Sequence, residues 1–392
     1  MPSPLFGKTF AELSHIVSDL SLPAYSARQI ADWLYKKNVS SIDEMTNLSG
    51  KARSLLAENY TTGVNEPLTV QTSEDGAKKY LFSASDNTFV EAAYIPDRER
   101  ATLCISSQVG CRMGCAFCMT ARQGMQGNLT ATGILNQFRS LPERDRLTNI
   151  VYMGMGEPFD NQDEVMKSLE ILTAGYGYAL APKRITVSTI GILPGIRYFM
   201  NNSRCHLAVS LHHPNPTERR KLMPVENKYP VKKVIELLKT YDLNKQRRIS
   251  FEYVMLAGVN DSLQQANDVV RLLSGLRCRV NLIRFHAIPG SSLKPSTEQA
   301  IQQFADTLNR KGIITTIRQS RGIDIDAACG MLSTRKQNSH DCSDQTNPFL
   351  GTSKNSQRHA ELVSASPRFQ EIAGHARNDG SVTNGVFRSP LL

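Results

Sequence analysis

Residues 104–124 read CISSQVGCRMGCAFCMTARQG and hold four of the eight cysteines of this 392-residue chain. Three of them, Cys111, Cys115 and Cys118, have the spacing C-x3-C-x2-C, and Cys104 precedes Cys111 by seven residues. Three thiolates this close on one loop can bind a metal group, because thiolates are ligands of both zinc and iron–sulfur clusters. A structural zinc needs a fourth ligand, such as Cys104 or a distant histidine, whereas an iron–sulfur cube held by three cysteines leaves one iron open.

Downstream of the cysteines, apolar strand-like runs alternate with helical patterns. The strand candidates are residues 149–155, 184–190, 206–212, 248–256, 279–285 and 312–318. Helical patterns such as PVKKVIELLKTY (230–241) and SLQQANDVVRLLSGL (262–276) lie between them. Because repeated β-then-α order favours parallel strands with helices outside, we predict an α/β fold that forms a partial (β/α) barrel. Its ligands should gather at the carboxyl ends of the strands, where the segments GMGEP, STIG, SLHH and FHAIPG fall.

The regions around the predicted barrel, residues 107–332, have different patterns. Residues 1–66 carry apolar side chains at helical spacing and predict a small N-terminal helical accessory domain. Residues 67–106 contain short β-type runs separated by turn residues, which predicts an antiparallel β extension. Residues 333–392 are rich in Ser, Asn and Gly, and we expect a disordered tail without a catalytic role.

Composition limits the class of protein. With 40% hydrophobic and 21% charged residues the chain is typical of a globular protein, and it has no apolar run of transmembrane length. The first residues show no secretory signal, so we expect a cytoplasmic protein without a membrane partner, in which clustered cysteines bind metal or do chemistry. The net charge of +10 permits an anionic partner such as nucleic acid but does not demand one.

The cysteine spacing, with aromatic Phe117 before the last cysteine, resembles the signature of radical S-adenosylmethionine (SAM) enzymes. In that superfamily the open iron of a 4Fe–4S cluster chelates the methionyl end of SAM, and one electron cleaves SAM to a deoxyadenosyl radical. A narrower resemblance, over about residues 5–332, is to the RlmN/Cfr family of radical-SAM RNA methyltransferases. Its motifs are TLCISSQVGC (102–111), MGMGEP (153–158), KLMP (221–224), GVNDS (258–262), VNLI (280–283) and DIDAACG (324–330).

The family resemblance implies a role for each cysteine of the chemistry. Cys111, Cys115 and Cys118 match the cluster ligands, and Cys329 matches the methyl-accepting position. One SAM methylates Cys329 and a second is cleaved, so two SAM molecules are used per turnover. The deoxyadenosyl radical removes a hydrogen atom from the S-methyl group, and the resulting carbon radical adds to an adenine in RNA. Cys104 matches the resolving cysteine, which releases the product through a transient disulfide with Cys329. Glu91 matches the proton acceptor.

The same resemblance implies a set of SAM contacts at the ends of the strands. They are Gly156, Glu157, Ser188, Ser210, Leu211, His212 and His286. His286 departs from the family, which usually has Asn there, although imidazole can replace an amide as a hydrogen-bond partner. Without the resemblance, such strand-end residues are usually structural, and a cysteine among small residues is usually an inert buried side chain.

The substrate follows from resemblance rather than from chemistry. DIDAACG looks like the branch that methylates carbon-2 of adenine, so we expect an adenine of 23S rRNA and an anticodon-loop adenine of tRNA as substrates, with carbon-8 as the alternative. Basic residues of KKYLF (78–82), ERRKLMP (218–224) and NKQRRIS (244–250) could neutralise RNA phosphates. We expect a monomer that receives electrons from a donor such as flavodoxin or ferredoxin. A radical-SAM enzyme on a non-RNA substrate and a zinc-stabilised RNA-binding protein are the rival classes.

Overall fold

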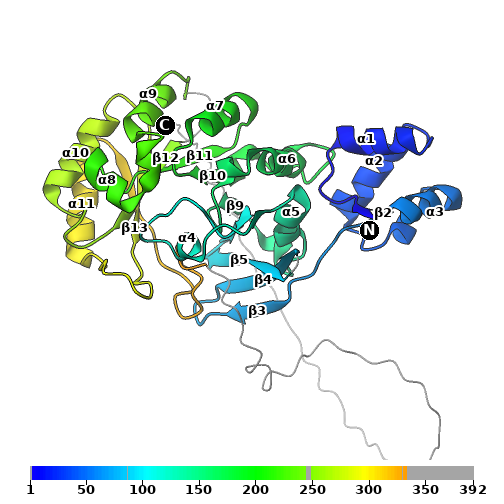
Figure 1. The fold of residues 1–392 in the computed structure, drawn as a ribbon, viewed down its shortest axis with the longest axis horizontal. Helices are drawn as coiled ribbons and strands as arrows, with labels where there is room; N and C mark the ends of the chain where they lie inside the picture. Colours follow the sequence, from blue (N-terminus) through cyan, green and yellow to red (C-terminus); the bar gives the residue numbers. More distant parts are fainter. Residues whose placement is uncertain (1, 86, 244–248, 329, 333–392) are drawn as a thin grey trace, which may run out of the picture. The chain divides into compact units, whose positions relative to one another are not determined.

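The computed structural model describes residues 2–85, 87–243, 249–328 and 330–332; Cys329 and the predicted tail lie outside these residues. Ten strands form one sheet in the order β14-β13-β12-β11-β10-β9-β6-β5-β4-β3 (Figure 1). The parallel strands are β6 (Arg100–Cys104), β9 (Asn149–Tyr152), β10 (Ile185–Thr189), β11 (His206–Ser210), β12 (Ile249–Met255), β13 (Arg279–Arg284) and β14 (Ile314–Ile317). Each of the six strands predicted for the barrel is present within its predicted range, which confirms the α/β architecture.

The antiparallel strands continue the same sheet. They are β3 (Thr69–Thr72), β4 (Lys78–Ser85) and β5 (Thr88–Asp97). Strand β6 is the junction, because it pairs antiparallel with β5 and parallel with β9. The predicted β extension and the barrel are therefore joined through continuous backbone hydrogen bonding, and a residue on β5 can share a face with one on β11.

Helices connect the parallel strands, and most of them bury one apolar face. They are α5 (Ala131–Arg139), α6 (Gln162–Thr173), α7 (Leu193–Asn202), α8 (Pro216–Leu222), α9 (Val231–Lys239), α10 (Leu263–Leu273) and α11 (Glu298–Arg310) (Figure 1). In α9 the buried residues are Val231, Val234, Ile235 and Leu238, which recur at the 3.6-residue helical period. No helix of the described ranges is both long enough and apolar enough to cross a membrane.

Short elements fill the connections between these strands and helices. They are β7 (Gln108–Val109), α4 (Met119–Gln123), β8 (Gly127–Asn128), and the 3-10 helices η3 (Arg144–Arg146), η4 (Pro158–Asp160), η5 (Pro182–Arg184) and η6 (Pro224–Asn227). The cysteine motif lies between β7 and α4, directly after the first parallel strand.

The N-terminal region is helical as predicted. Its elements are β1 (Ser3–Pro4), α1 (Phe10–Asp19), α2 (Ser26–Ala31), the π-helix η1 (Asp32–Lys37), the 3-10 helix η2 (Ile42–Glu44), α3 (Gly50–Asn59) and β2 (Tyr60–Thr61). Helix α1 begins with a capping box, in which the Thr9 hydroxyl accepts from the Glu12 amide and the Glu12 carboxylate accepts from the Thr9 amide.

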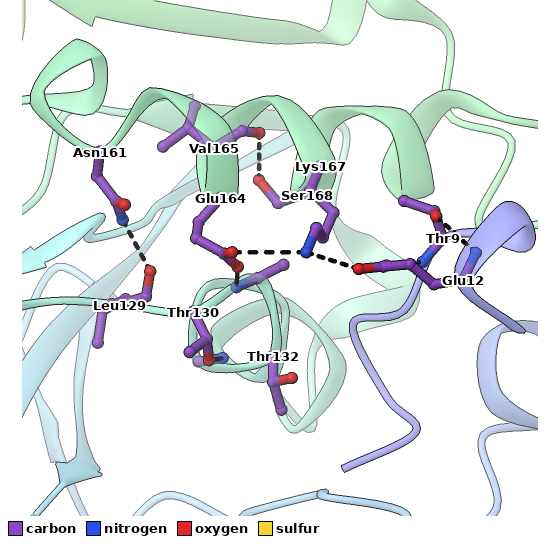
Figure 2. Close-up of polar contacts among 12 residues, drawn as sticks. Thr9, Glu12, Leu129, Thr130, Thr132, Asn161, Glu164, Val165, Lys167 and Ser168 are labelled. Carbon is purple, nitrogen blue, oxygen red and sulfur yellow. Dashed lines mark hydrogen bonds and ion pairs between the residues drawn. The ribbon is translucent and has the colours of Figure 1, made fainter. Parts of the chain in front are cut away.

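The same Glu12 ties the N-terminal helices to the barrel (Figure 2). Lys167 on α6 donates to Glu12 at 2.9 Å and to Glu164 at 3.5 Å. The Glu164 carboxylate in turn accepts from the backbone amide of Ala131 at 2.5 Å, at the first turn of α5. The side chains of Glu12, Lys167 and Glu164 thereby link α1, which is far away in the sequence, to α6 and to the first turn of α5.

Candidate functional site

One face of the sheet collects the predicted residues from four strands. Directly paired residues share a face, and alternate residues along one strand return to it. The connecting pairs are Ala93 with Cys104, Cys104 with Val151, Val151 with Thr186, Ser188 with Ala208, and Ser210 with Glu252. Glu91, Cys104, Ser188 and Ser210 therefore lie on the same face, which we call the site face.

The cysteine loop is closed at its base and held over the ends of the strands. Strands β7 and β8 pair Val109 with Gly127, and the Cys111 amide donates to the Gly124 carbonyl at 3.1 Å. Gly110 has a φ of +73°, and a side chain there would lie 1.7 Å from the Gly124 carbonyl oxygen, so only glycine fits. Cys115 packs in one apolar cluster with Val254, Leu256 and Phe285, which end β12 and follow β13.

The three motif cysteines form a donor set suited to an iron–sulfur cluster. Burial and the neighbouring Cys118 raise the pKa of the Cys111 thiol to about 12 and raise that of Cys115 well above its usual value. A bound metal group reverses this preference, because a coordinating thiol is held deprotonated. Among the described residues no three His, Cys, Asp or Glu side chains are grouped as ligands of one metal ion. A 4Fe–4S cluster needs no such group, since each thiolate binds a separate iron.

Glu157 of the GMGEP turn braces the neighbouring strand. Its carboxylate accepts from the Thr189 hydroxyl at 2.6 Å, from the Phe159 amide at 3.1 Å, and from the Ile190 amide at 2.9 Å. The side chain is buried, and burial raises its pKa to about 7. Both oxygens are thus engaged with the end of β10 and the turn itself, so a SAM contact from Glu157 would have to share an oxygen that already accepts a hydrogen bond.

The glycines of this turn allow another segment of the chain to pack closely against it. A side chain at Gly154 would lie 2.7 Å from the Ile105 backbone, and one at Gly156, whose φ is +99°, would lie 2.6 Å from Gln108. The segment between β6 and the cysteine loop therefore packs directly against the turn. The glycine-rich motif predicts that a ligand makes this close approach, whereas here the space beside both glycines is filled by protein.

His212 is buried beside the aromatic residue of the cysteine motif. Its ring meets Phe117 edge to face with centroids 4.6 Å apart, and Nδ1 accepts from the Val254 amide at 3.0 Å. Burial lowers the pKa of His212 to about 3, so the imidazole is neutral. The backbone has a φ of +55°, and Asn260 of the GVNDS motif holds it by donating to the His212 carbonyl at 2.7 Å.

Arg219 connects two strand ends beneath the site. Its guanidinium is fully buried and donates to the carbonyls of Leu211 at 2.9 Å, Ser210 at 2.8 Å and Ile190 at 3.1 Å. Its ion-pair partner is Glu226, also buried. Through these contacts one side chain fixes the relative position of the STIG and SLHH segments.

Glu91 and Cys104 lie on the antiparallel half of the site face, where Cys104 pairs with Ala93, two residues after Glu91. Glu91 is 6% exposed, and its carboxylate lies 3.4 Å from the ammonium of Lys79. The Ser106 hydroxyl donates to the Glu91 carbonyl at 2.6 Å. Cys104 is buried and packs with Ala93 and with Ala327, two residues before Cys329.

The segment that contains position 329 is held at both of its described ends. Toward its start, Gly322 donates its amide to Asp75 at 2.9 Å. Toward its end, Met119 of α4 donates its amide to the Gly330 carbonyl at 2.8 Å, and Thr120 donates to the Leu332 carbonyl at 2.6 Å. Cys329 itself lies outside the described residues, but the residues on either side of it contact both α4, which follows the cysteine motif, and the β3–β4 turn.

The two remaining predicted SAM contacts lie at different strand ends. Leu211 is fully buried, and its amide donates to the Glu252 carbonyl at 2.9 Å. His286, which follows β13, is half-buried, and its Nε2 lies 2.8 Å from the Ser320 hydroxyl. Burial and then Arg284 lower the pKa of His286.

Among the described basic residues considered as phosphate contacts, most have partners within the protein. Lys78 pairs with Glu143 at 2.5 Å, Lys79 with Glu91, and Lys221 with Glu218 at 2.8 Å. Arg219, in the same basic run as Lys221, is fully buried, so it is neither a phosphate contact nor part of a solvated helix face. Residues 244–248 of the third basic run lie outside the described residues.

Sequence reasoning missed four residues that shape the site. They are Gln108, which accepts from the Glu157 amide, together with Thr189, Arg219 and Glu252. Glu252 had a readable signal, since it is a carboxylate inside the strand-like run ISFEYVML, where every residue from 249 to 255 is buried. A charged residue in a buried strand calls for a partner or a ligand.

Comparison with known proteins bears on the whole described region. The model of the Radical SAM superfamily matches residues 105–270, and that of the ribosomal RNA large subunit methyltransferase N-terminal domain matches residues 4–61. The chain is 58% identical over 334 residues to a "Probable dual-specificity RNA methyltransferase RlmN" of Bacteroides fragilis, covering 85% of this chain and 97% of that one.

Two further relatives extend the comparison. A "Dual-specificity RNA methyltransferase RlmN" of Syntrophus aciditrophicus is 42% identical over 326 residues, covering 82% of this chain and 94% of that one. The crystal structure of a radical SAM methyltransferase from Sphaerobacter thermophilus superposes with a TM-score of 0.79 at 39% identity. It covers 84% of this chain and 99% of the other. Fold and sequence are therefore shared over nearly the full length of these relatives.

Proposed function

This chain belongs to the RlmN family of radical-SAM RNA methyltransferases, and we propose on that premise that it methylates carbon-2 of adenine. Its substrates are one adenine of 23S rRNA and an anticodon-loop adenine of tRNA. The dual-specificity name of the relatives supports two RNA substrates, and the match of residues 4–61 to the rRNA methyltransferase N-terminal domain supports residues 1–66 as an accessory domain of its own.

The observation that carries this proposal is the shared site face. Glu91 and Cys104 come from the antiparallel strands and Ser188 and Ser210 from the parallel ones, yet the strand pairing aligns them on one side of a single sheet. Ala327, two residues before Cys329, packs against Cys104. This arrangement supports Glu91 as the proton acceptor, Cys104 as the resolving thiol and the segment after Ala327 as the carrier of the methyl group.

Cys111, Cys115 and Cys118 would hold the 4Fe–4S cluster, and the strand ends at Gly156, Ser188, Ser210, Leu211, His212 and His286 would hold SAM beside it. When bound, the cluster and SAM supply a one-electron route that activates a methyl carbon, which an electron-poor adenine carbon needs because it cannot attack a sulfonium. Glu157 and Arg219 support these contacts, because their hydrogen bonds hold the GMGEP turn and the ends of the strands in position.

The chain's own cysteines and carboxylate carry the group transfer. The Cys329 sulfur would accept a methyl group from one SAM, with S-adenosylhomocysteine as the leaving group. The radical that cleavage of the second SAM supplies would remove one hydrogen atom from that methyl group, so that its carbon can bond to the adenine ring carbon and link it to Cys329. The one electron that is left over when the ring carbon loses its proton would return to the cluster. Glu91 takes the proton from the adenine ring carbon. The Cys104 thiolate then attacks the Cys329 sulfur, so that a disulfide bond forms, the bond from sulfur to the methylene carbon breaks, and the electron pair leaves with that carbon, which gains a proton to become the methyl group.

This sequence of steps sets the requirements for the rest of the cycle. Two SAM molecules are used per turnover, one for the methyl group and one for the activation. The Cys104–Cys329 disulfide must be reduced and the cluster needs electrons, which is why we assign a low-potential donor such as flavodoxin or ferredoxin. We propose that the protein is a cytoplasmic monomer.

Methylation in vitro tests the assignment. The anaerobically reconstituted protein is incubated with methyl-deuterated SAM, a reductant and either a 23S rRNA fragment or a tRNA, and the digested nucleosides are analysed by mass spectrometry. We expect 2-methyladenosine with label from SAM in both RNAs. Labelled 8-methyladenosine would replace the carbon-2 assignment, and SAM cleavage without any labelled nucleoside would point to a non-RNA substrate.

A further inference from the structure

Glu252 has one carboxylate oxygen without a hydrogen-bond partner inside the site. The side chain is only 4% exposed, and within the described part of the chain its Oε2 accepts no hydrogen bond. The other oxygen, Oε1, accepts from the Ser250 hydroxyl at 3.0 Å and from the Asn281 amide at 2.7 Å. Arg318 lies 3.9 Å from Oε2, beyond hydrogen-bond distance, and its own side chain is 42% exposed.

Burying a carboxylate oxygen without a hydrogen-bond donor raises the free energy of the folded protein. Leaving a buried acceptor without a donor forfeits the hydrogen bonds that water makes in the unfolded chain, and the penalty is larger for a charged group than for a neutral one. Native proteins pair nearly all such atoms, so an unpartnered one calls for an explanation. A bound ligand that donates to Oε2 would provide it.

The position of Glu252 shows which part of a ligand it would meet. It pairs across the strands with Ser210 on one side and Asn281 on the other, so it lies on the site face next to a predicted SAM contact. Val254, two residues further along the same face, packs in the cluster that contains Cys115. At about 3.3 Å per residue, Glu252 is therefore roughly 7 Å deeper along the strand than Val254.

We propose that Glu252 Oε2 accepts a hydrogen bond from the ribose hydroxyls of SAM. The inference rests on the proposed function, in which the methionyl end of SAM occupies the open iron at the cysteine loop. The nucleoside half then extends away from that loop along the site face, toward the row formed by Ser210, Glu252 and Asn281. The ribose presents two adjacent O–H donors, which match an anionic acceptor that has no donor of its own.

Binding measurements on the anaerobic holoenzyme test this proposal without relying on turnover. The dissociation constants of SAM and of its 2′-deoxy and 3′-deoxy analogues are measured by equilibrium dialysis for the wild type, Glu252→Gln and Glu252→Ala. Because a hydrogen bond to a charged group is lost, we expect SAM to bind the Ala variant about tenfold or more weakly, and the Gln variant to lie between. For at least one deoxy analogue, we expect the affinity for the wild type to be as low as the affinity of SAM for Glu252→Ala. The Glu252→Ala variant should bind this analogue and SAM equally well.

Two control variants separate binding from folding. Glu298→Gln removes an exposed carboxylate that pairs with Arg284, and Arg318→Met removes the distant ion-pair partner of Glu252; both should bind SAM within about twofold of the wild type. The electron paramagnetic resonance signal of the reduced cluster should be equal in all variants that are compared. Wild-type SAM affinity in both Glu252 variants would overturn the proposal, and so would an equal loss for SAM and both deoxy analogues. A wild-type protein that bound no SAM would instead overturn the proposed function.

Discussion

The Ser73 hydroxyl donates a hydrogen bond of 2.6 Å to the Asp324 carboxylate, although the two residues are 251 positions apart in the chain. A second hydrogen bond joins the same two segments, since the Asp75 carboxylate accepts from the Gly322 amide at 2.9 Å. Together these bonds dock the β3–β4 turn on the segment that leads to Cys329. A turn at the edge of the antiparallel extension therefore holds one end of the segment that carries the proposed methyl acceptor.

Removing this contact should slow methyl transfer without weakening SAM binding. For Asp324→Ala we expect RNA methylation to fall about threefold to tenfold, since a hydrogen bond that positions the segment is lost while the strand ends are untouched. Initial rates with RNA and the SAM dissociation constant are measured side by side. Asp145→Asn, which alters an exposed carboxylate of η3, serves as the control. Unchanged rates for Asp324→Ala would show that the docking has no role in catalysis.

The resolving role of Cys104 predicts a covalent trap. In Cys104→Ala the methylene bridge between Cys329 and the adenine has no thiol to release it, so a protein–RNA adduct should accumulate in a single turnover. Denaturing electrophoresis and mass spectrometry of the digested adduct detect it. Cys205→Ala, at a buried cysteine directly before β11, should turn over normally. Normal turnover by Cys104→Ala would show that another group resolves the adduct.

Breaking the buried ion pair at Arg219 should destabilise the protein strongly. Arg219→Met leaves Glu226 buried without its cation and removes three hydrogen bonds to strand-end carbonyls. We expect a loss of about 3 kcal/mol or more in the free energy of unfolding, measured by chemical denaturation. Adding Glu226→Gln should recover part of that loss, since the uncompensated charge is removed. A loss below about 1 kcal/mol for Arg219→Met would contradict this account of the pair.

The raised pKa of Glu157 predicts a specific pH dependence of stability. Burial raises the pKa from 4.5 to about 7, so between these values the folded protein binds more protons at this group than the unfolded chain does. The contribution of Glu157 to stability therefore falls as pH rises from about 4.5 to 7. The measurement compares the free energies of unfolding of Glu157→Gln and the wild type. The value for the variant minus that for the wild type should rise over this pH window by up to about 3 kcal/mol and stay constant at higher pH. A difference that fell with pH would refute the sign of the shift.

The architecture could be predicted from the sequence because its signals are local. Six apolar runs and the helical patterns between them placed six of the seven parallel strands correctly, and each of these strands is shorter than its run because backbone pairing stops where the chain turns. The junction at β6 was less visible, since a strand that pairs antiparallel on one side and parallel on the other has no distinct pattern of its own.

Motifs in the sequence predicted which residues end the strands, but not the contacts that these residues make. Motifs named Glu157, Ser188, Ser210 and His212, yet only the structure shows that the Glu157 carboxylate binds Thr189 and Ile190 and that His212 Nδ1 binds a backbone amide. Arg219 was hidden in an ordinary basic run, because its burial depends on contacts with the ends of two strands, 8 to 29 residues away. Such long-range contacts leave no periodic pattern to read.

The central claim, methylation of carbon-2 of adenine in RNA, is tested most directly by nucleoside analysis. Mass spectrometry is applied to rRNA and tRNA purified from cells with and without this gene. We predict that 2-methyladenosine disappears from both RNA pools when the gene is deleted and returns with the wild-type gene but not with Cys329→Ala. If 2-methyladenosine were unchanged by the deletion, or if 8-methyladenosine were lost in its place, the carbon-2 assignment would be contradicted.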